Sequence, residues 1–321
     1  MVESRIEDQE EPKSAWVDVD GTRLHYLAWD PEQQEAISTM PGSQEMVQAG
    51  DEIPLVMLHG MGATAAIWRL VAPYLYRHHL IVAFDLRGHG ESDAPESGYD
   101  FATVAEDVVH GMAGLGLGKI ALIGHGWGAR VALALAVRHP ALVSHLILVD
   151  CPLVEPKHWP GMTRTRFMRQ KPALEMYASR AAFMAAIQDE MSGFWSPAIE
   201  AIFLTFVREL PDGKIEERLQ PEQQQQIRQS LWEEHALPYY GKVRCPVLLI
   251  PAAAPPLPGG QPPEKLENAV EFAAAKGYMA VQVARIIPTC TVLWMPDTAH
   301  DIQLHRPQRL AAAIASFVRE Q

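Results

Sequence analysis

Six short apolar runs, most of them followed by a segment of helical periodicity, constrain the fold of this 321-residue chain more than any other feature. The apolar runs are IPLVMLHG (53–60), HLIVAFD (79–85), KIALIG (119–124), LVSHLILVD (142–150), PVLLIPA (246–252) and CTVLWMP (290–296). The helix-like segments are AAIWRLVAPYLYR (65–77), FATVAEDVVHGMAGL (101–115), WGARVALALAVRH (127–139) and RPQRLAAAIASFVRE (306–320). Short apolar strands that alternate with helices are typical of a mostly parallel sheet with both faces covered. The sequence therefore predicts an α/β fold.

Three other stretches have a clear local signature. VDVDGTRLHYLAW (17–29) places Asp-Gly between two alternating arms, which predicts an N-terminal antiparallel hairpin. Residues 253–263 are so rich in Pro and Gly that neither a helix nor a strand can continue through them. The polar, turn-rich residues 30–52 are expected to form a surface loop.

Residues 153–237 interrupt the alternation of strands and helices. They contain no convincing strand, are rich in Met, Phe and Gln, and lie between two expected core strands. We therefore expect a helical lid inserted into a core formed by residues 1–152 and 238–321. Within the lid, QPEQQQQIRQ (220–229) is expected to be a helix with a solvated face.

Composition narrows the class of protein. Hydrophobic residues make up 48% of the chain, which is ample for a large core. The sequence contains no run of 18 apolar residues, so we expect no transmembrane helix. The acidic N-terminus lacks the hydrophobic segment of a signal peptide. The formal net charge of −12 argues against non-specific binding of nucleic acid or of an anionic membrane.

The cysteines and the missing cofactor motifs add two expectations. Cys151, Cys245 and Cys290 are odd in number and far apart, as is typical of reduced thiols in a cytoplasmic protein. The sequence shows no phosphate loop, dinucleotide fingerprint or metal-ligand cluster, so we expect no cofactor. It leaves the oligomeric state open.

Four motifs stand at the ends of the expected strands. They are His59-Gly60-Met61-Gly62, the segment Asp85-Leu86-Arg87-Gly88-His89-Gly90-Glu91-Ser92-Asp93, Gly124-His125-Gly126-Trp127-Gly128, and Asp297-Thr298-Ala299-His300. In this order they resemble the H-G-x-x turn, the D-x-R-G-x-G-x-S segment, the G-x-S-x-G nucleophile elbow and the catalytic histidine of the α/β-hydrolase family. The resemblance covers nearly the whole chain. It implies an α/β-hydrolase fold with a mostly parallel central sheet, helices on both faces and an inserted helical cap.

In that family two backbone N–H groups bind the developing oxyanion. The resemblance assigns them to Met61, in the turn after Gly60, and to Trp127, directly after the nucleophile position. It assigns the general base to His300. Helix N-termini and Gly-rich turns expose N–H groups in any case, so the turns could also be purely structural. The two turns together favour a retained site for a carbonyl or an anion.

Three other reactive side chains are expected to be structural. His59 is expected to brace the oxyanion turn, and His125 to have no chemical role. Cys151 is expected to be a buried thiol.

The orienting acid is ambiguous. The family's usual position is the loop after PVLLIPA, which here reads AAAPPLPGG and has no carboxylate. Asp150 ends a strand where some family members place their acid, but many relatives also carry a structural acidic residue there. Asp297 and Asp301 flank His300, and sequence neighbours rarely orient an imidazole ring. Asp150 is thus the candidate acid, with catalytic and structural interpretations both open.

The nucleophile position is vacated, because Gly126 has no side chain and cannot form a covalent intermediate. The elbow residue usually has a positive φ, which glycine adopts without strain. Glycine also leaves a side-chain-sized space beside the base.

Three interpretations of Gly126 remain open. The chain could hydrolyse an ester or similar acyl bond without a covalent step, through a water activated by His300. It could be an inactive relative that binds or senses a small molecule. It could be an ordinary Ser or Asp hydrolase that carries a substitution to glycine. For the nucleophile that Gly126 replaces, Ser is slightly favoured over Asp, because the turn at Met61 lacks the proline that is frequent in epoxide hydrolases.

The lid should set the class of substrate. Its apolar and adaptable side chains are Met162, Phe167, Met168, Met176, Tyr177, Phe183, Met184, Phe194, Trp195, Phe203 and Phe206. They predict a small apolar substrate or ligand, although most must also pack the lid onto the core. Epoxide opening would need acidic donors, for which Tyr177, Tyr239 and Tyr240 are candidates.

Overall fold

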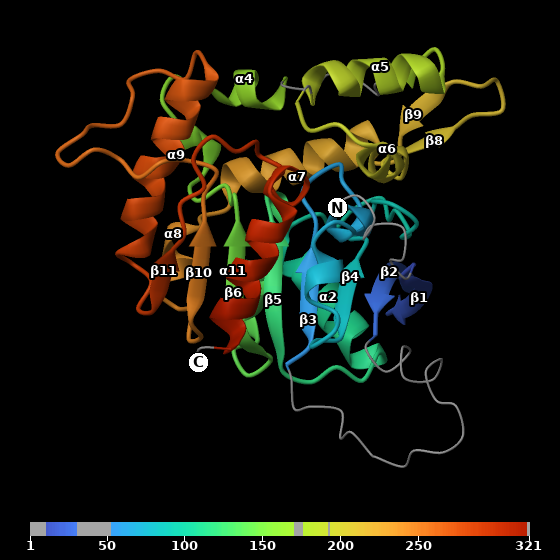
Figure 1. Ribbon diagram of the computed structural model, residues 1–321, viewed down its shortest axis with the longest axis horizontal. Helices are drawn as coiled ribbons and strands as arrows, with labels where there is room; N and C mark the ends of the chain where they lie inside the picture. The colour runs from blue at the N-terminus through green and yellow to red at the C-terminus, as the bar shows by residue number, and fades with distance from the viewer. Residues whose placement is uncertain (1–10, 31–52, 170–175, 192, 320–321) are drawn as a thin grey trace, which may run out of the picture.

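A computed structural model describes residues 11–30, 53–169, 176–191 and 193–319 of the chain (Figure 1). Its centre is an eight-stranded sheet of order β1-β2-β4-β3-β5-β6-β10-β11. The strands are β1 (Lys13–Val19), β2 (Thr22–Trp29), β3 (Leu55–Leu58), β4 (Ile81–Phe84), β5 (Ile120–His125), β6 (Val143–Val149), β10 (Val247–Ile250) and β11 (Cys290–Val292). From β4 to β11 every neighbouring pair is parallel, whereas β1 and β2 are antiparallel additions at one edge. The α/β fold and all six predicted core strands are confirmed.

Helices cover both faces of this sheet. One face packs against α2 (Phe101–Gly114), α3 (Trp127–Arg138), α8 (Leu237–Tyr240) and α9 (Ala269–Ala284). The other packs against the short 3-10 helices η2 (Ala65–Trp68) and η3 (Ala72–Tyr74) and against α10 (Ile302–His305) and α11 (Pro307–Arg319). Figure 1 shows α11 in front of the sheet. The four central strands β3 to β6 are almost fully buried because both their faces are covered.

The N-terminal hairpin forms where the Asp-Gly pair predicts it. Val19 pairs with Thr22 across a two-residue turn, and Asp20 and Gly21 have φ values of 52° and 82°. Two consecutive positive φ angles define the turn that suits the twist of a hairpin. Of the loop predicted just after it, residues 31–52 lie outside the described residues.

Two local expectations are wrong. Residues 65–77 form two 3-10 helices rather than one α-helix, because Pro73 has no N–H to donate to the preceding turn. The segment 153–237 does contain strands, in a small antiparallel sheet of order β7-β9-β8. Its strands are β7 (Met176–Tyr177), β8 (Val207–Glu209) and β9 (Ile215–Glu217). Strands of two or three residues are too short to show an alternating pattern.

The other elements of this segment are helical. They are η4 (Pro156–His158), α4 (Arg164–Met168), α5 (Arg180–Glu190), α6 (Pro197–Leu204) and α7 (Pro221–Glu233). Figure 1 shows α4 to α7 and the small sheet above the ends at which the central strands point. The segment lies between β6 and β10 in the sequence. It is therefore well placed to shape whatever binds at the carboxyl ends of the strands.

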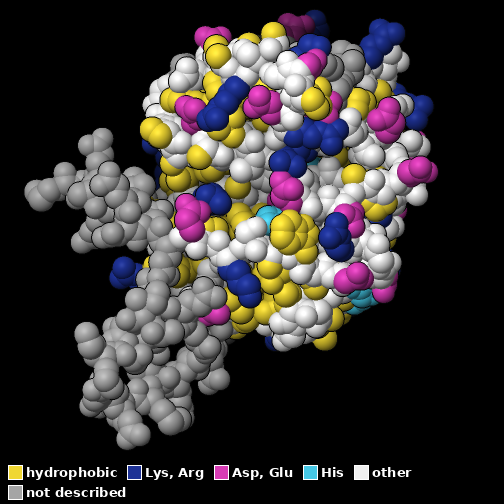
Figure 2. All heavy atoms as spheres, turned by 90° about the vertical axis from the view of Figure 1, so that its right-hand side faces the viewer, with side chains coloured by type: hydrophobic (Ala, Val, Ile, Leu, Met, Phe, Trp, Pro, Cys, Tyr) yellow, Lys and Arg dark blue, Asp and Glu magenta, His cyan; other side chains and the backbone are white. Residues whose placement is uncertain are grey.

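The surface at the β1 edge carries both signs of charge. Figure 2 shows Lys and Arg side chains interspersed with Asp and Glu over this face. Ion pairs such as Arg23 with Asp93 and Arg218 with Glu91 join the two signs. The acidic excess of the chain therefore forms no single-signed patch on this face.

Candidate active site

The elbow is a sharp turn that glycines make possible. β5 ends at His125, Gly126 has φ 53° and ψ −122°, and α3 begins at Trp127. A Cβ on Gly124 would lie 2.5 Å from the Cα of Ala129, and one on Gly128 would collide with the carbonyl oxygen of His59. The outer glycines of the motif are thus required by close packing of the helix on the strands.

A side chain at Gly126 would point toward His300. An ideal Cβ there would lie 3.3 Å from His300 Nε2 and 3.5 Å from the Cα of Gly60. No contact is tighter than that, so a small side chain fits if the His300 ring shifts by a few tenths of an ångström, apart from the strain of the positive φ. The vacated position therefore adjoins the ring nitrogen that a general base would use.

His300 is oriented by Asp150. The distance from His300 Nδ1 to Asp150 Oδ2 is 2.6 Å, within hydrogen-bond range. Asp150 Oδ1 also accepts from the backbone N–H of Ala252 at 2.9 Å, and Oδ2 accepts from Lys276 Nζ at 2.7 Å. Burial raises the pKa of Asp150, but His300 and Lys276 outweigh it and hold the pKa well below its ordinary value. The carboxylate is therefore ionised throughout the neutral range.

This pairing fixes the tautomer of His300. An ionised Asp150 can only accept, so Nδ1 carries the proton and Nε2 of the neutral ring is left as the base. Burial lowers the pKa of His300, and the hydrogen bond and charge of Asp150 raise it by more. The net pKa lies above the ordinary 6.5, and Lys276 opposes part of this rise. The side chain keeps 57% exposure to the cavity, while the surrounding protein removes enough water from the ring to oppose its charged form.

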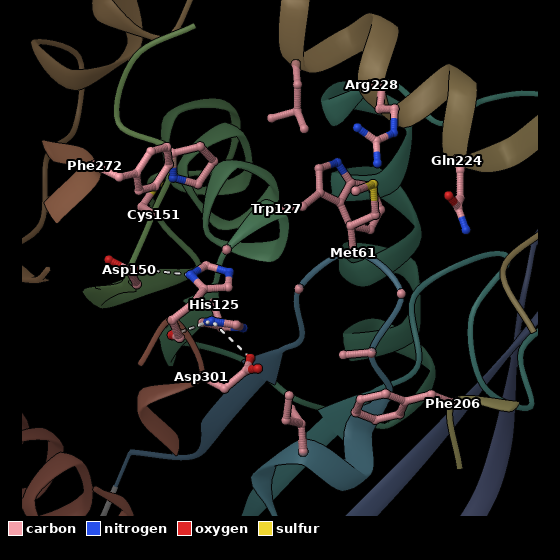
Figure 3. Close-up of a pocket in the computed structure, with 18 of the residues that line it drawn as sticks. Met61, His125, Trp127, Asp150, Cys151, Phe206, Gln224, Arg228, Phe272 and Asp301 are labelled. Carbon is pink, nitrogen blue, oxygen red and sulfur yellow. Dashed lines mark hydrogen bonds and ion pairs between the residues drawn. The ribbon is translucent and has the colours of Figure 1, made fainter. Parts of the chain in front are cut away.

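A second histidine supports this ring from below. The rings of His125 and His300 are 4.5 Å apart, and His125 Nε2 lies 3.2 Å from the backbone oxygen of His300. Gln303 Nε2 donates to the other ring nitrogen of His125 at 3.2 Å. Burial, followed by the neighbouring His300, lowers the pKa of His125 to about 4. His125 is therefore a neutral positioning residue, and Figure 3 shows it beneath the ring that pairs with Asp150.

The oxyanion turn is held from behind by His59. Its Nε2 accepts from the N–H of Leu86 at 2.9 Å, so Nδ1 carries the proton and donates to the oxygen of Gly60 at 2.7 Å. Burial lowers the pKa of His59, which keeps the ring neutral in this role. The N–H of Trp127 has no partner within α3, because it belongs to the first helical residue.

A cavity of about 570 Å³ joins these groups. All six residues predicted for the site line it: Gly60, Met61, Gly126, Trp127, Asp150 and His300. Most of the aromatic lining comes from the inserted segment and includes Phe167, Phe183, Phe203 and Phe206, whereas Trp127 and Phe272 come from α3 and α9. Figure 3 shows the cavity between the strand ends below and α7 above. The arrangement brings a base, an oriented acid and candidate oxyanion donors into one water-accessible space.

Two basic residues that line the cavity, Lys276 and Arg228, were not identified from the sequence. Lys276 lies on α9, which follows the irregular Pro/Gly-rich loop, and no sequence motif marks this helix as part of the site. Arg228 lies in the glutamine-rich segment expected to have a solvated face. That expectation is incomplete, since α7 buries Ile227, Arg228 and Leu231. The spacing of these three residues was the available signal for a buried face.

Other candidate reactive groups do not fit the chemistry. Cys151 lines the cavity, but burial raises the pKa of its thiol to about 12, so the nucleophilic thiolate is absent at neutral pH. Tyr239 and Tyr240 do not line the cavity, and the hydroxyl of Tyr240 donates to the oxygen of Leu153. Tyr177 lies in β7, and its side chain is outside the described residues. Among the described residues no group of three metal-ligating side chains occurs, and no helix is long and apolar enough to cross a membrane.

Solved structures with the same architecture define the class of protein. E-2-(Acetamidomethylene)succinate Hydrolase aligns with a TM-score of 0.72 over 96% of this chain and 99% of its own, at 21% identity. A thioesterase domain from the curacin biosynthetic pathway aligns with a TM-score of 0.68 over 97% of this chain and 100% of its own, at 16% identity. This is the α/β-hydrolase fold, and a family model described as "alpha/beta hydrolase fold" matches residues 53–183. Residues 53–183 therefore match the α/β-hydrolase family model, and the chain shares the α/β-hydrolase fold along nearly its whole length.

Curated relatives match a shorter stretch. A soluble epoxide hydrolase of Corynebacterium sp. (strain C12) is 41% identical over 104 residues, which are 32% of this chain and 36% of that protein. The 1-acylglycerol-3-phosphate O-acyltransferase ABHD5 of Sus scrofa is 38% identical over 104 residues, or 31% of this chain and 30% of that protein. The match thus spans about a third of the length of these relatives.

Proposed function

We propose that this chain hydrolyses an ester or similar acyl bond without a covalent intermediate, using a water held in the space above Gly126. The observation that carries the proposal is the position of His300 Nε2. It belongs to a ring oriented by Asp150 and lies 3.3 Å from the point where a side chain of residue 126 would begin. A water in that space can donate a hydrogen bond to the base and face a bound carbonyl.

The reaction balances with this chain's own groups. His300 Nε2 takes a proton from the water while the water oxygen attacks the carbonyl carbon. The backbone N–H groups of Met61 and Trp127 stabilise the negative charge that develops on the carbonyl oxygen. The tetrahedral species then collapses, and the protonated His300 gives its proton to the leaving oxygen or nitrogen. Asp150 stays ionised and stabilises the imidazolium.

The fold neighbours favour acyl chemistry over epoxide opening. A succinate-derivative hydrolase and a thioesterase domain share the fold along nearly the whole chain. The soluble epoxide hydrolase is similar over about a third of the chain only. In the cavity, Asp at position 126 would be the required nucleophile, and neither Tyr239 nor Tyr240 reaches the space. We further propose that residues 153–237 act as the lid that makes the cavity apolar.

A non-catalytic binder is the second candidate function. Lys276 shares Asp150 with His300, and its charge lowers the pKa of the base. Lys276 thus limits how far Asp150 can raise the pKa of His300, and this limit beside a missing nucleophile suits a protein that retains its ligand rather than converting it. The third candidate is an ordinary hydrolase in which the nucleophile has been replaced by glycine. The pairing of Asp150 with His300 is compatible with this candidate, because base and acid would then be present and only the nucleophile absent.

Hydrolysis of p-nitrophenyl acetate and butyrate by wild type, His300→Ala and Gly126→Ser separates these candidates. The proposal expects wild type to exceed buffer, and His300→Ala to fall to the background. Equal rates in wild type and His300→Ala would refute it and favour the binder. Gly126→Ser is expected to add an acyl-enzyme detectable as a mass adduct, and its absence in a folded variant would contradict an otherwise intact catalytic site.

A further inference from the structure

The roof of the cavity carries a buried cation that no described carboxylate neutralises. Arg228 is 6% exposed and lines the cavity from α7. Its Nη1 donates to the oxygen of Phe167 at 3.1 Å, and its guanidinium lies 5.8 Å from the centre of the Phe167 ring. Among the described residues no carboxylate oxygen lies within ion-pair distance of it, and the charge of Glu217 acts on it from farther away. Its Nε has no hydrogen-bond partner there either.

A second unmatched donor lines the same space. Trp127 is 3% exposed, and its indole Nε1 has no hydrogen-bond partner among the described residues. Figure 3 shows the guanidinium of Arg228 directed from α7 toward the indole of Trp127. Buried donors are nearly always satisfied, and a buried charge without a partner is costly. Two side chains that line one cavity thus each carry an unmatched donor, which points to an acceptor that is absent from the unliganded cavity.

The other cation of the cavity is paired, whereas the carboxylates of Glu217 and Asp301 are hydrogen-bonded to neutral amides, which do not remove their charge. Lys276 is neutralised by Asp150 at 2.7 Å. Glu217 accepts from the amide of Gln224 at 2.7 Å, and Asp301 accepts from Gln303 at 3.3 Å. Arg228 therefore remains the cavity cation that has a charge to offer a ligand, among the residues described.

From these donors we infer that the substrate of the proposed hydrolysis carries a carboxylate, which Arg228 and the indole N–H of Trp127 bind beneath α7. The planar guanidinium suits a carboxylate because its N–H groups can pair with both oxygens. The same Trp127 offers its backbone N–H to the scissile carbonyl, so the carboxylate and the reacting bond lie on one short acyl unit. This inference rests on the proposed function and adds a carboxylate to the small apolar substrate that the sequence predicts.

The inference makes the subsite a determinant of specificity. A substrate without the charge would leave Arg228 unpaired in the complex and lose the energy of that pairing. Inorganic anions share the chemistry but lack the apolar body that the aromatic lining would cover. Sulfate therefore probes the charge, hexanamide probes the shape, and hexanoate probes both together.

Binding of the three probes is measured by calorimetry and by the indole ¹H–¹⁵N NMR signals of the full chain. The signal of Trp127 is assigned by its loss in Trp127→Phe. We expect hexanoate to move this signal and to bind at least tenfold more tightly than either hexanamide or sulfate. Arg228→Met should lose at least tenfold in hexanoate affinity, Arg228→Lys should lose less, and hexanamide binding should hardly change.

Arg138→Met is the matched control, because it removes one positive charge at an exposed helix end outside the cavity. It should bind hexanoate like wild type. Equal affinity for hexanoate and hexanamide would overturn the inference, as would an equal loss in Arg138→Met. Sulfate binding as tightly as hexanoate would overturn the claim that the anion belongs to a substrate. Should Arg228→Met fail to fold, Arg228→Lys and Trp127→Phe still test it through the calorimetry.

His300→Ala separates this inference from the proposed function. It should bind hexanoate like wild type while losing turnover. Hexanoate selectivity in a wild-type protein without turnover would refute the proposed hydrolysis and leave the subsite standing. Turnover of neutral esters with no preference for a carboxylate would do the reverse.

Discussion

The floor and the roof of the cavity are built by different means. The floor consists of the turn at Gly60 and Met61 and the elbow at Gly126 and Trp127, where backbone geometry is set by close packing. The roof is α7, whose contribution is made by side chains such as Arg228. A backbone turn that requires glycine at fixed positions can be recognised as a sequence motif, whereas a single side chain on a helix cannot. The comparison suggests that the floor determines the chemistry and the roof selects the substrate.

The largest expected effect comes from refilling the floor. Gly126→Ser should raise kcat/KM for a p-nitrophenyl ester by about 10²- to 10³-fold, because the hydroxyl would adjoin His300 Nε2 and permit covalent catalysis. Gly126→Ala is the matched control and should give no increase. At φ 53° either side chain should also lower the free energy of unfolding by about 1 kcal/mol. Steady-state kinetics and urea unfolding measure both effects, and a folded serine variant no faster than the alanine variant would break the assignment of the floor.

The next effect tests whether the floor tolerates any added atom. Gly128→Ala should destabilise the protein by about 3 kcal/mol, since its Cβ would collide with the oxygen of His59 and lie 2.9 Å from that of Leu58. Gly118→Ala is the matched control, because nothing lies within 4 Å of its added Cβ. Urea unfolding midpoints compare the two. Similar midpoints would mean that the elbow packing is looser than the structure shows.

The same contrast explains what the sequence could predict. The sheet follows from the apolar runs and the hairpin from its Asp-Gly pair, and Gly60, Met61, Gly126, Trp127 and His300 follow from motifs at strand ends, because these signals are local in the chain. The role of Asp150 could not be settled from sequence, because its partner His300 is 150 residues away and the choice depends on where β6 and β10 lie. Lys276 and Arg228 were missed because their significance arises only when α9 and α7 fold over the strand ends.

The pH dependence of turnover tests the dyad at the edge of the floor. Catalysis needs neutral His300, so activity should rise with pH through a pKa above 6.5. Lys276→Met should move this pKa upward, because the lysine charge lowers it. The stabilising pairing of protonated His300 with Asp150 is fully present below pH 6.5 and is lost as pH rises through the raised pKa. The Tm difference between wild type and His300→Gln should shrink over the same range, and a pH-independent difference would count against the pairing.

The smallest expected effect is on the stability of the roof, where a substitution should stabilise the protein rather than destabilise it. Arg228→Met removes a buried charge that has no described counterion but also removes the hydrogen bond to Phe167. Replacing a buried ion pair by apolar residues stabilises proteins by about 1 to 4 kcal/mol, and relief of one uncompensated charge should act in the same direction. Loss of the hydrogen bond costs about 1 kcal/mol, so the unliganded protein should gain slightly in stability. In thermal unfolding without ligand, the Tm of Arg228→Met should equal that of wild type or lie a few degrees above it. Arg130→Met is the control and should lower the Tm, because it loses two hydrogen bonds at a site outside the cavity. A Tm of Arg228→Met as low as that of Arg130→Met would mean that the roof arginine is held for structure, as the floor is, and the division between floor and roof would not stand.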